Sequence, residues 1–281
     1  MNHPERVVVT AALTGAVTPK DINEFIPLTP AEIAADAYAC WKAGAAVVHL
    51  HMRDDDGVGT MSADKFAETI RLIRAHEDCD VVVNCTTSGD NRASDVERMH
   101  HVATLDGIEM ASYDAGSFNW MPGGVFMNSP KFLGELGETM MKRGVKPEIE
   151  IFDAGMLGVA EYFMKKGRLA TPGHYQFCLG VLGGMPATVE NLLYLRGKIP
   201  ADATWSAFGI GKDHLPILYA ALALGGNVRV GLEDNVYFSK GVKATNVGLV
   251  ERAVEAIRLF GKRPATSAEA REILGLPALK H

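Results

Sequence analysis

Residues 46–76, AVVHLHMRDDDGVGTMSADKFAETIRLIRAH, contain the pattern that decides the fold. The segment opens with a short apolar run, residues 46–51, that is typical of a buried strand, and after Ser62 it continues as a helical pattern to about His76. Parallel strands need a crossover connection, usually a helix. One strand followed by one helix is therefore the building unit of a parallel sheet.

The same unit recurs along the whole chain. Strands are predicted at residues 7–13, 46–51, 81–85, 107–111, 147–152, 174–180, 203–208 and 227–233. The helical patterns that follow them cover residues 30–41, 63–76, 94–103, 131–143, 156–166, 188–196, 215–224 and 245–260. Eight units in 281 residues predict an α/β protein that forms a single (β/α)8 TIM barrel over residues 1–281. An open doubly wound sheet is the alternative, but its glycine fingerprint is absent after the first strand.

The C-terminal segment and the overall composition give further expectations. Residues 264–280 predict a short helical tail, packed on the outside of the barrel or on a partner subunit. A formal net charge of -6 and a pI near 5.9 argue against nucleic-acid binding, which needs a basic surface. The chain shows neither a signal peptide nor an apolar run of membrane-spanning length. Its four cysteines have no paired spacing, so we expect a reduced, cytoplasmic protein.

Polar residues gather where the predicted strands end, which is where barrel enzymes place their active groups. His49 and His51 end the second strand, and because residues two apart on a strand share a face, their imidazoles stand side by side. Strands two and eight flank strand one in a closed barrel, which brings Glu233 within reach. Two imidazoles and one carboxylate are the ligand set of a catalytic zinc ion with an open position, so we predict that these three residues bind a metal. The alternative is two hydrogen-bonded histidines without a metal.

The predicted fifth and eighth strands carry charged residues on their inward faces. Alternation places Arg229, Gly231 and Glu233 on one face of the eighth strand, with the arginine one layer below the carboxylate. Glu148 and Glu150 alternate with isoleucines, so these glutamates also face inward. They either form a salt bridge with Arg229 or Lys146, or one of them, with Glu150 preferred, contacts the ligand or a group that supports it.

Two loops at the same end are candidates for binding anions. The segment after the third strand offers hydroxyl and N–H groups that suit a carboxylate, although these groups could equally cap the following loop; it comprises Asn84, Thr86, Thr87, Ser88 and Gly89, and Ser112 follows the next strand. The loop after the seventh strand contains Gly209, Gly211 and Lys212 before a helix, an arrangement that holds phosphate in many barrels. A plain tight turn is the alternative for this loop. Residues 118–124, which are rich in aromatic side chains, indicate a lid or an oligomer contact.

Six segments together resemble the beta-keto acid cleavage enzyme family (3-keto-5-aminohexanoate cleavage enzyme-like). They are TAALTGAVTP at residues 10–19, VVHLHMRDDDG at 47–57, VNCTTSGD at 83–90, EMASYDAGSFNW at 109–120, PEIEIFDAGML at 147–157 and GGNVRVGLEDN at 225–235. The resemblance implies a TIM barrel with zinc held by His49, His51 and Glu233. It also implies catalytic roles for Arg229 and Asp234, and substrate binding by residues 84–89.

The reaction that this resemblance implies consumes a β-keto acid and acetyl-CoA, and releases acetoacetate and the CoA thioester of the shortened acid. Zinc would stabilise the enolate of the keto acid, and Asp234, oriented by Arg229, would accept the proton. Family members that act on aminated substrates carry an acidic residue where this chain has Val17. Because a buried carboxylate suits an ammonium group and valine does not, we expect a substrate with an uncharged side chain.

Two other functions remain open at this point. A metal-dependent hydrolase of the amidohydrolase type is also a barrel with a His-x-His pair, but it places the pair on strand one and adds histidines on strands five and six. Here the pair is on strand two and strand five carries glutamates. A non-catalytic ligand-binding barrel is the other alternative. The enzyme is expected to form a homo-oligomer, a dimer or a tetramer.

Overall fold

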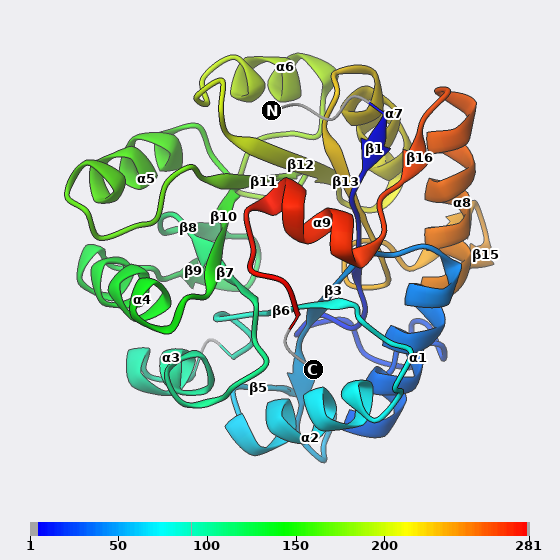
Figure 1. Cartoon of the computed structure of the whole chain (residues 1–281), viewed down its shortest axis with the longest axis horizontal. Helices are drawn as coiled ribbons and strands as arrows, with labels where there is room; N and C mark the ends of the chain where they lie inside the picture. The colour runs from blue at the N-terminus through cyan, green and yellow to red at the C-terminus, as the bar shows by residue number, and fades with distance from the viewer. Residues whose placement is uncertain (1–4, 91, 280–281) are drawn as a thin grey trace.

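The structure, a computed structural model, describes residues 5–90 and 92–279. Eight parallel strands close into a barrel in which each strand pairs with the next along the chain and the last pairs with the first (Figure 1). The strands are β2 (Val9–Ala12), β3 (Val47–Leu50), β6 (Val82–Cys85), β7 (Met110–Asp114), β10 (Lys146–Ile151), β11 (His174–Leu179), β12 (Thr204–Gly209) and β13 (Asn227–Val230). The predicted TIM barrel is confirmed, and the open sheet is excluded.

A helix follows each barrel strand and packs on its outer side. These helices are α1 (Pro30–Ala43), α2 (Ala63–Arg74), α3 (Asp95–Thr104), α4 (Pro130–Arg143), α5 (Gly155–Lys165), α6 (Val189–Arg196), α7 (His214–Ala223) and α8 (Asn246–Leu259). Local sequence explains where several of them begin. Thr29 and Ser94 accept a hydrogen bond from the third helical N–H, and Glu32 and Glu97 bond back to the cap in the reciprocal arrangement of a capping box.

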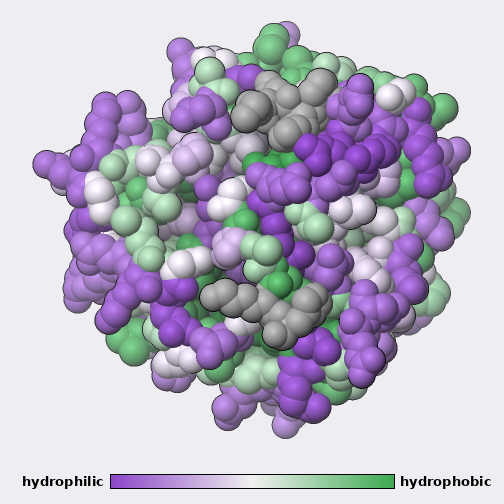
Figure 2. Space-filling view, in the orientation of Figure 1, coloured by the Kyte–Doolittle hydropathy of each residue, from purple (hydrophilic) through white to green (hydrophobic). Residues whose placement is uncertain are grey.

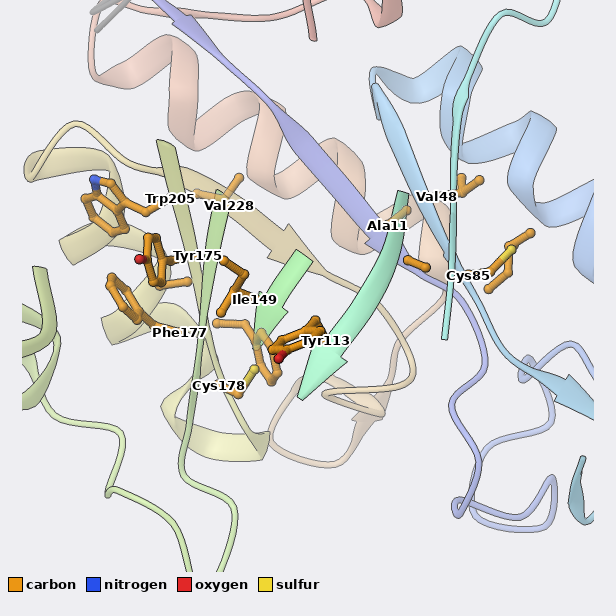
Figure 3. Packing of buried hydrophobic residues seen from close by; sticks show 14 of the residues in the cluster. Ala11, Val48, Cys85, Tyr113, Ile149, Tyr175, Phe177, Cys178, Trp205 and Val228 are labelled. Atoms are coloured by element: carbon orange, nitrogen blue, oxygen red, sulfur yellow. The ribbon is translucent and has the colours of Figure 1, made fainter. Parts of the chain in front are cut away.

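Alternation along the strands separates an apolar outer face from a polar inner face. Figure 3 shows Val48, Tyr113 and Ile149 among the side chains packed between the strands and the helices. Their neighbours His49 and Glu150 must then point into the barrel, because successive strand residues face opposite sides. Parallel barrels usually fill this interior with branched aliphatic residues. The polar interior of this barrel is therefore a feature that the fold does not require.

The N-terminal end of the barrel is closed by a helix from the C-terminal segment. Helix α9 (Ser267–Leu274) lies across the middle of the barrel in Figure 1, on the face that Figure 2 shows. Its Ala270 and Leu274 form a cluster with inward residues of the strands, including Val47 and Met110. The tail therefore plugs the barrel rather than lying on its outside. Nothing in its own pattern could have revealed this, because the apolar cluster that it covers includes residues of three distant strands, β3, β6 and β7.

Two predicted strand boundaries were wrong, and both lie next to residues that the sequence proposed for the active site. The fourth strand runs on to Asp114, so Ser112 lies within it rather than after it. The eighth strand stops at Val230, and the backbone turns at Gly231, which has a φ of 150°. A Cβ at Gly231 would lie 1.9 Å from the carbonyl oxygen of Ala12, so only glycine fits there. Glu233 is therefore aimed by this turn and not by strand alternation.

Of the helices in the described ranges, none combines the length and the apolar character that crossing a membrane requires.

Candidate active site

A cavity of about 500 Å³ opens at the C-terminal ends of the barrel strands. The loop after β2, which includes Gly15 and Val17, forms one side of it. The opposite side is formed by a hairpin of β8 (Phe118–Trp120) and β9 (Gly124–Phe126), whose rings cluster with Phe152. The aromatic segment that the sequence assigned to a lid or an oligomer contact is thus part of the cavity wall. Its lid and oligomer roles stay predictions.

His49, His51 and Glu233 meet at the floor of this cavity. Glu233 Oε1 lies 3.4 Å from His51 Nε2 and 3.8 Å from His49 Nε2. Three donor atoms, one from each side chain, all lie within 4.8 Å of one another. The three residues line the cavity, so a ligand could reach a group bound between them.

This geometry fits a single zinc ion. Two atoms bound to one tetrahedral zinc ion at about 2.1 Å lie roughly 3.4 Å apart, close to the two separations above. Glu233 Oε2 is buried and has no hydrogen-bond partner among the described residues, which leaves it free for a cation. A second group, His49 with Glu148 and Glu150, is equally compact, but its carboxylates already bind Asn84 and Arg229. The first set is therefore the better metal site.

Glu148 is placed to orient His49. Its Oε2 accepts a hydrogen bond from Asn84 Nδ2 at 2.7 Å and lies 3.5 Å from His49 Nδ1. Metal-binding histidines commonly direct their second ring nitrogen at a carboxylate, which fixes the tautomer and frees the other nitrogen for the metal. Burial lowers the pKa of His49 well below its usual value, so the ring is neutral and able to act as a ligand.

Arg229 forms ion pairs with several carboxylates around the site. Its Nε and Nη2 donate to the two oxygens of Asp234 at 2.9 and 3.0 Å, an arrangement that fixes the carboxylate plane. The guanidinium also donates to Glu150 at 3.2 Å and to Glu233 at 2.5 Å. Its carbon lies 4.5 Å from the ring centre of Phe208. The side chain is 2% exposed, so the ion pairs replace its lost hydration.

The two neighbouring carboxylates Glu233 and Asp234 differ in acidity. Burial alone would raise the pKa of Glu233, but His51, Arg229 and His49 outweigh it and hold that pKa well below the usual range. Burial raises the pKa of Asp234 to about 6, against the lowering effect of Arg229. Environments that separate the pKa values of adjacent carboxylates give them separate roles. Glu233 stays ionised, which suits a metal ligand, whereas Asp234 can take up and release a proton near neutral pH.

The loop that holds Glu233 in place depends on a residue that we did not predict. Arg53 is 2% exposed and donates to the carbonyls of Gly15, Gly57 and Thr18 at 2.7, 2.8 and 2.9 Å. It therefore fixes the loop after β2. A Cβ at Gly15 would lie 2.8 Å from Glu233 Cγ, so the loop packs directly on the Glu233 side chain. The arginine was visible in the sequence two residues after His51, but its targets were not.

The residues that the sequence proposed for substrate binding fall into two groups, those that line the cavity and those that lie below its surface. Thr86, Ser88, Gly89 and Glu150 line the cavity. Three others lie below its surface and hold the framework: Asn84 binds Glu148, and the Thr87 amide donates to Ser112 Oγ at 2.9 Å.

The loop after β12 needs its glycines for its own backbone structure. The amide of Gly211 donates to the carbonyl of Asp234 at 3.0 Å, and a Cβ at Gly209 would lie 2.6 Å from the carbonyl oxygen of Asp213. These contacts support the tight-turn interpretation, and Lys212 is exposed. Binding of phosphate by this loop stays a prediction.

Sequence reasoning also missed two buried groups. His101 on α3 is fully buried and stacks on Phe66 with ring centres 4.3 Å apart. Burial lowers its pKa to about 4. Asp114 was not singled out at all, because it lies beyond the predicted end of the fourth strand. It is 1% exposed and lines the cavity.

Comparisons with known proteins identify relatives of this chain. Residues 6–276 match the family model of the beta-keto acid cleavage enzymes. The chain is 40% identical to 3-keto-5-aminohexanoate cleavage enzyme of Acetoanaerobium sticklandii, covering 97% of this chain and 99% of that protein. It is 36% identical to 3-dehydrocarnitine:acetyl-CoA trimethylamine transferase of Rhizobium meliloti, covering 96% of each. The apo structure of ObcA superposes with a TM-score of 0.78 at 22% identity, over 91% of this chain and 66% of that one, and shares the fold.

Proposed function

The chain belongs to the beta-keto acid cleavage enzyme family, and from that premise we propose that it is a zinc-dependent acyltransferase that condenses a β-keto acid with acetyl-CoA. The products are acetoacetate and the CoA thioester of the shortened acid. The observation that carries the proposal is the meeting of His49, His51 and Glu233 in the cavity, directly beside the Asp234–Arg229 pair. The hydrolase and ligand-binding alternatives have no comparable observation in their favour.

His49, His51 and Glu233 would hold the zinc ion. When bound, the ion supplies a Lewis acid and positive charge at the floor of the cavity, where the oxygens of a β-keto acid become more electron-rich during reaction. The surrounding protein adds to this effect, because Arg229 carries a positive charge among several buried carboxylates.

Asp234 would act as the general base. Its ionised carboxylate accepts a proton from the methylene between the two carbonyl groups of the substrate. The two hydrogen bonds from Arg229 fix the carboxylate and keep it ionised near neutral pH, although burial favours the neutral form. The site thereby generates a carbon nucleophile without a redox cofactor.

The remaining steps exchange one carbon–carbon bond and one thioester bond. The deprotonated methylene carbon attacks the acetyl carbonyl, and the CoA thiolate leaves. The thiolate then adds to the original ketone carbon, and the bond between this carbon and the methylene carbon breaks. The electron pair returns to the methylene carbon, which takes back the proton from Asp234. Atoms and charges balance, so nothing but the two substrates is consumed.

The cavity walls suggest where the substrates lie. Thr86 and Ser88 present hydroxyl groups beside Gly89, and we propose that this segment binds the substrate carboxylate, with Glu150 nearby. Asn84, Thr87 and Ser112 support it from below. Val17 and Val58 line the same cavity, and their apolar side chains support a substrate with an uncharged side chain. Gly209, Gly211 and Lys212 are proposed for the CoA phosphates. We also propose that the protein is cytoplasmic and that it forms a homo-oligomer, either a dimer or a tetramer.

The test is a labelling experiment with a panel of β-keto acids. The metal-loaded protein is incubated with each acid and with acetyl-CoA labelled at the carbonyl carbon. Transfer puts the label at the ketone carbon of acetoacetate and leaves the new acyl-CoA unlabelled. Unlabelled products, or products formed without acetyl-CoA, would show hydrolysis instead. Removal of the metal with a chelator should stop the reaction, and added Zn²⁺ should restore it.

A further inference from the structure

Asp114 is a buried carboxyl group that the proposed mechanism does not use. It is the last residue of β7, it lines the cavity, and only 1% of its surface is exposed. Neither of its oxygens has a hydrogen-bond donor among the described residues. Burying an ionised carboxylate without a partner is costly, so the arrangement needs a physical explanation.

The group that faces Asp114 is another carboxyl group. Asp114 and Glu150 are register partners on the adjacent parallel strands β7 and β10. Both side chains are buried and line the same cavity, and burial together with Asp114 raises the pKa of Glu150 well above its usual value. Two ionised carboxylates can only accept hydrogen bonds. Two carboxyl groups side by side in a buried site are therefore stable when one proton is shared between them.

No nearby cation can take the place of that proton among the residues that the structure describes. Arg229 gives its donors to Asp234, Glu150 and Glu233. Arg98 on α3 donates to the carbonyls of Thr87 and Met127 and to the side-chain oxygen of Asn128. The titratable and charged groups that face the pair are Glu148 on β10, His49 on β3, Cys178 on β11, Arg98 on α3, and Arg229 and Asp234 at the end of β13.

We propose that Asp114 and Glu150 share a single proton, and that Asp114 is thereby the positioning residue at the far end of a chain that runs through Glu150 and Arg229 to Asp234. The proton keeps the pair at one negative charge. Glu150 then accepts one hydrogen bond from Arg229 at 3.2 Å, while the guanidinium keeps both of its bonds to Asp234. Loss of the proton would add a second charge that competes with Asp234 for Arg229.

This role rests on the proposed function, because it assumes that Asp234 is the base. The physical claim has a direct consequence for substitution. In an Asp114→Asn variant the new amide side chain would carry no charge and would donate N–H to Glu150, so it reproduces the charge and the hydrogen bond of the protonated pair. Alanine at the same position removes the hydrogen bond and leaves a cavity.

The first measurement compares kcat/KM against pH for the wild-type protein, Asp114→Asn and Asp114→Ala. Near neutral pH the asparagine variant should keep most of the wild-type activity, whereas alanine should lower kcat/KM by about tenfold. The alkaline decline of the wild type should move to higher pH in the asparagine variant, since that variant has no shared proton to lose. Asp153→Asn, an exposed charge change near the same mouth, should leave the profile unchanged.

The second measurement does not depend on catalysis. Infrared difference spectra of the wild type minus Asp114→Asn, at neutral pH, should show the carbonyl stretch of a protonated carboxyl group that the variant lacks. Absence of that band overturns the shared proton. A band without the kinetic rescue by asparagine, or without the shift of the alkaline decline, overturns the positioning role. Failure of the proposed function would appear separately, as no acetoacetate from the wild type, while the spectra would still decide on the proton.

Discussion

Replacing Asp234 with asparagine separates the general base from the metal site. The carboxylate receives hydrogen bonds from Arg229 Nε and Nη2 at 2.9 and 3.0 Å. Asparagine keeps one acceptor and presents an NH₂ group to the other donor, so one charge-assisted hydrogen bond is lost, at a cost of about 1.5–3 kcal/mol in the free energy of unfolding. A positioned general base contributes on the order of 10²–10⁴ to the rate, so kcat should fall by that factor. Metal binding should persist, because Glu233 and both histidines are unchanged.

The assay has two parts that are measured on the same preparation. Acyl-CoA formation gives kcat, and elemental analysis after gel filtration gives the metal content per chain. Asp213→Asn, which removes a carboxylate near the mouth that caps no helix hydrogen bond, is the matched control and should keep full activity. The wild-type kcat/KM should rise as the pH increases through about 6, because burial raises the pKa of Asp234 to about 6 and only the ionised form accepts a proton. An Asp234→Asn protein that loses its metal, or keeps wild-type turnover, refutes this division of roles.

Four further outcomes are expected. Glu233→Gln should lose most of its bound metal on gel filtration, because the amide is a poorer ligand, and elemental analysis would show this directly. In Arg53→Lys a single ammonium nitrogen replaces three guanidinium nitrogens that each reach a different loop carbonyl. Part of these hydrogen bonds should be lost, so KM should rise and metal affinity should fall, as measured by steady-state kinetics and zinc titration. Val17→Glu should raise kcat/KM for aminated β-keto acids relative to uncharged ones in the substrate panel. An unchanged ratio would refute the claim that residue 17 selects the substrate side chain. Burial lowers the pKa of His101 to about 4, so below about pH 6.5 the unfolded chain binds more protons than the folded chain. The free energy of unfolding therefore falls as the pH falls from 7 to 4. His101→Phe should reduce this fall by about 3 kcal/mol, as measured by urea unfolding at the two pH values.

The order of the barrel strands, and the meeting of His49, His51 and Glu233 at one end of the barrel, could be predicted from the sequence. His49 and His51 are two residues apart on a strand, so they share a face in any register. Glu233 joins them because a closed barrel places its last strand beside its first. The mechanism of its placement was nevertheless wrong, since the strand ends at Val230 and a turn at Gly231 aims the side chain.

The sequence by itself determined which residues within the strands point into the barrel, because their side-chain direction follows from the alternation along each strand. Only the tertiary structure decided which of those residues meet. Asp114 faces Glu150 through the register between two strands, and no pattern within either strand records that register. Arg53 reaches carbonyls of the preceding βα loop, and α9 covers side chains from three strands, for the same reason. Contacts between elements depend on how those elements are shifted and packed against each other, and this information is carried by the whole chain rather than by any segment of it.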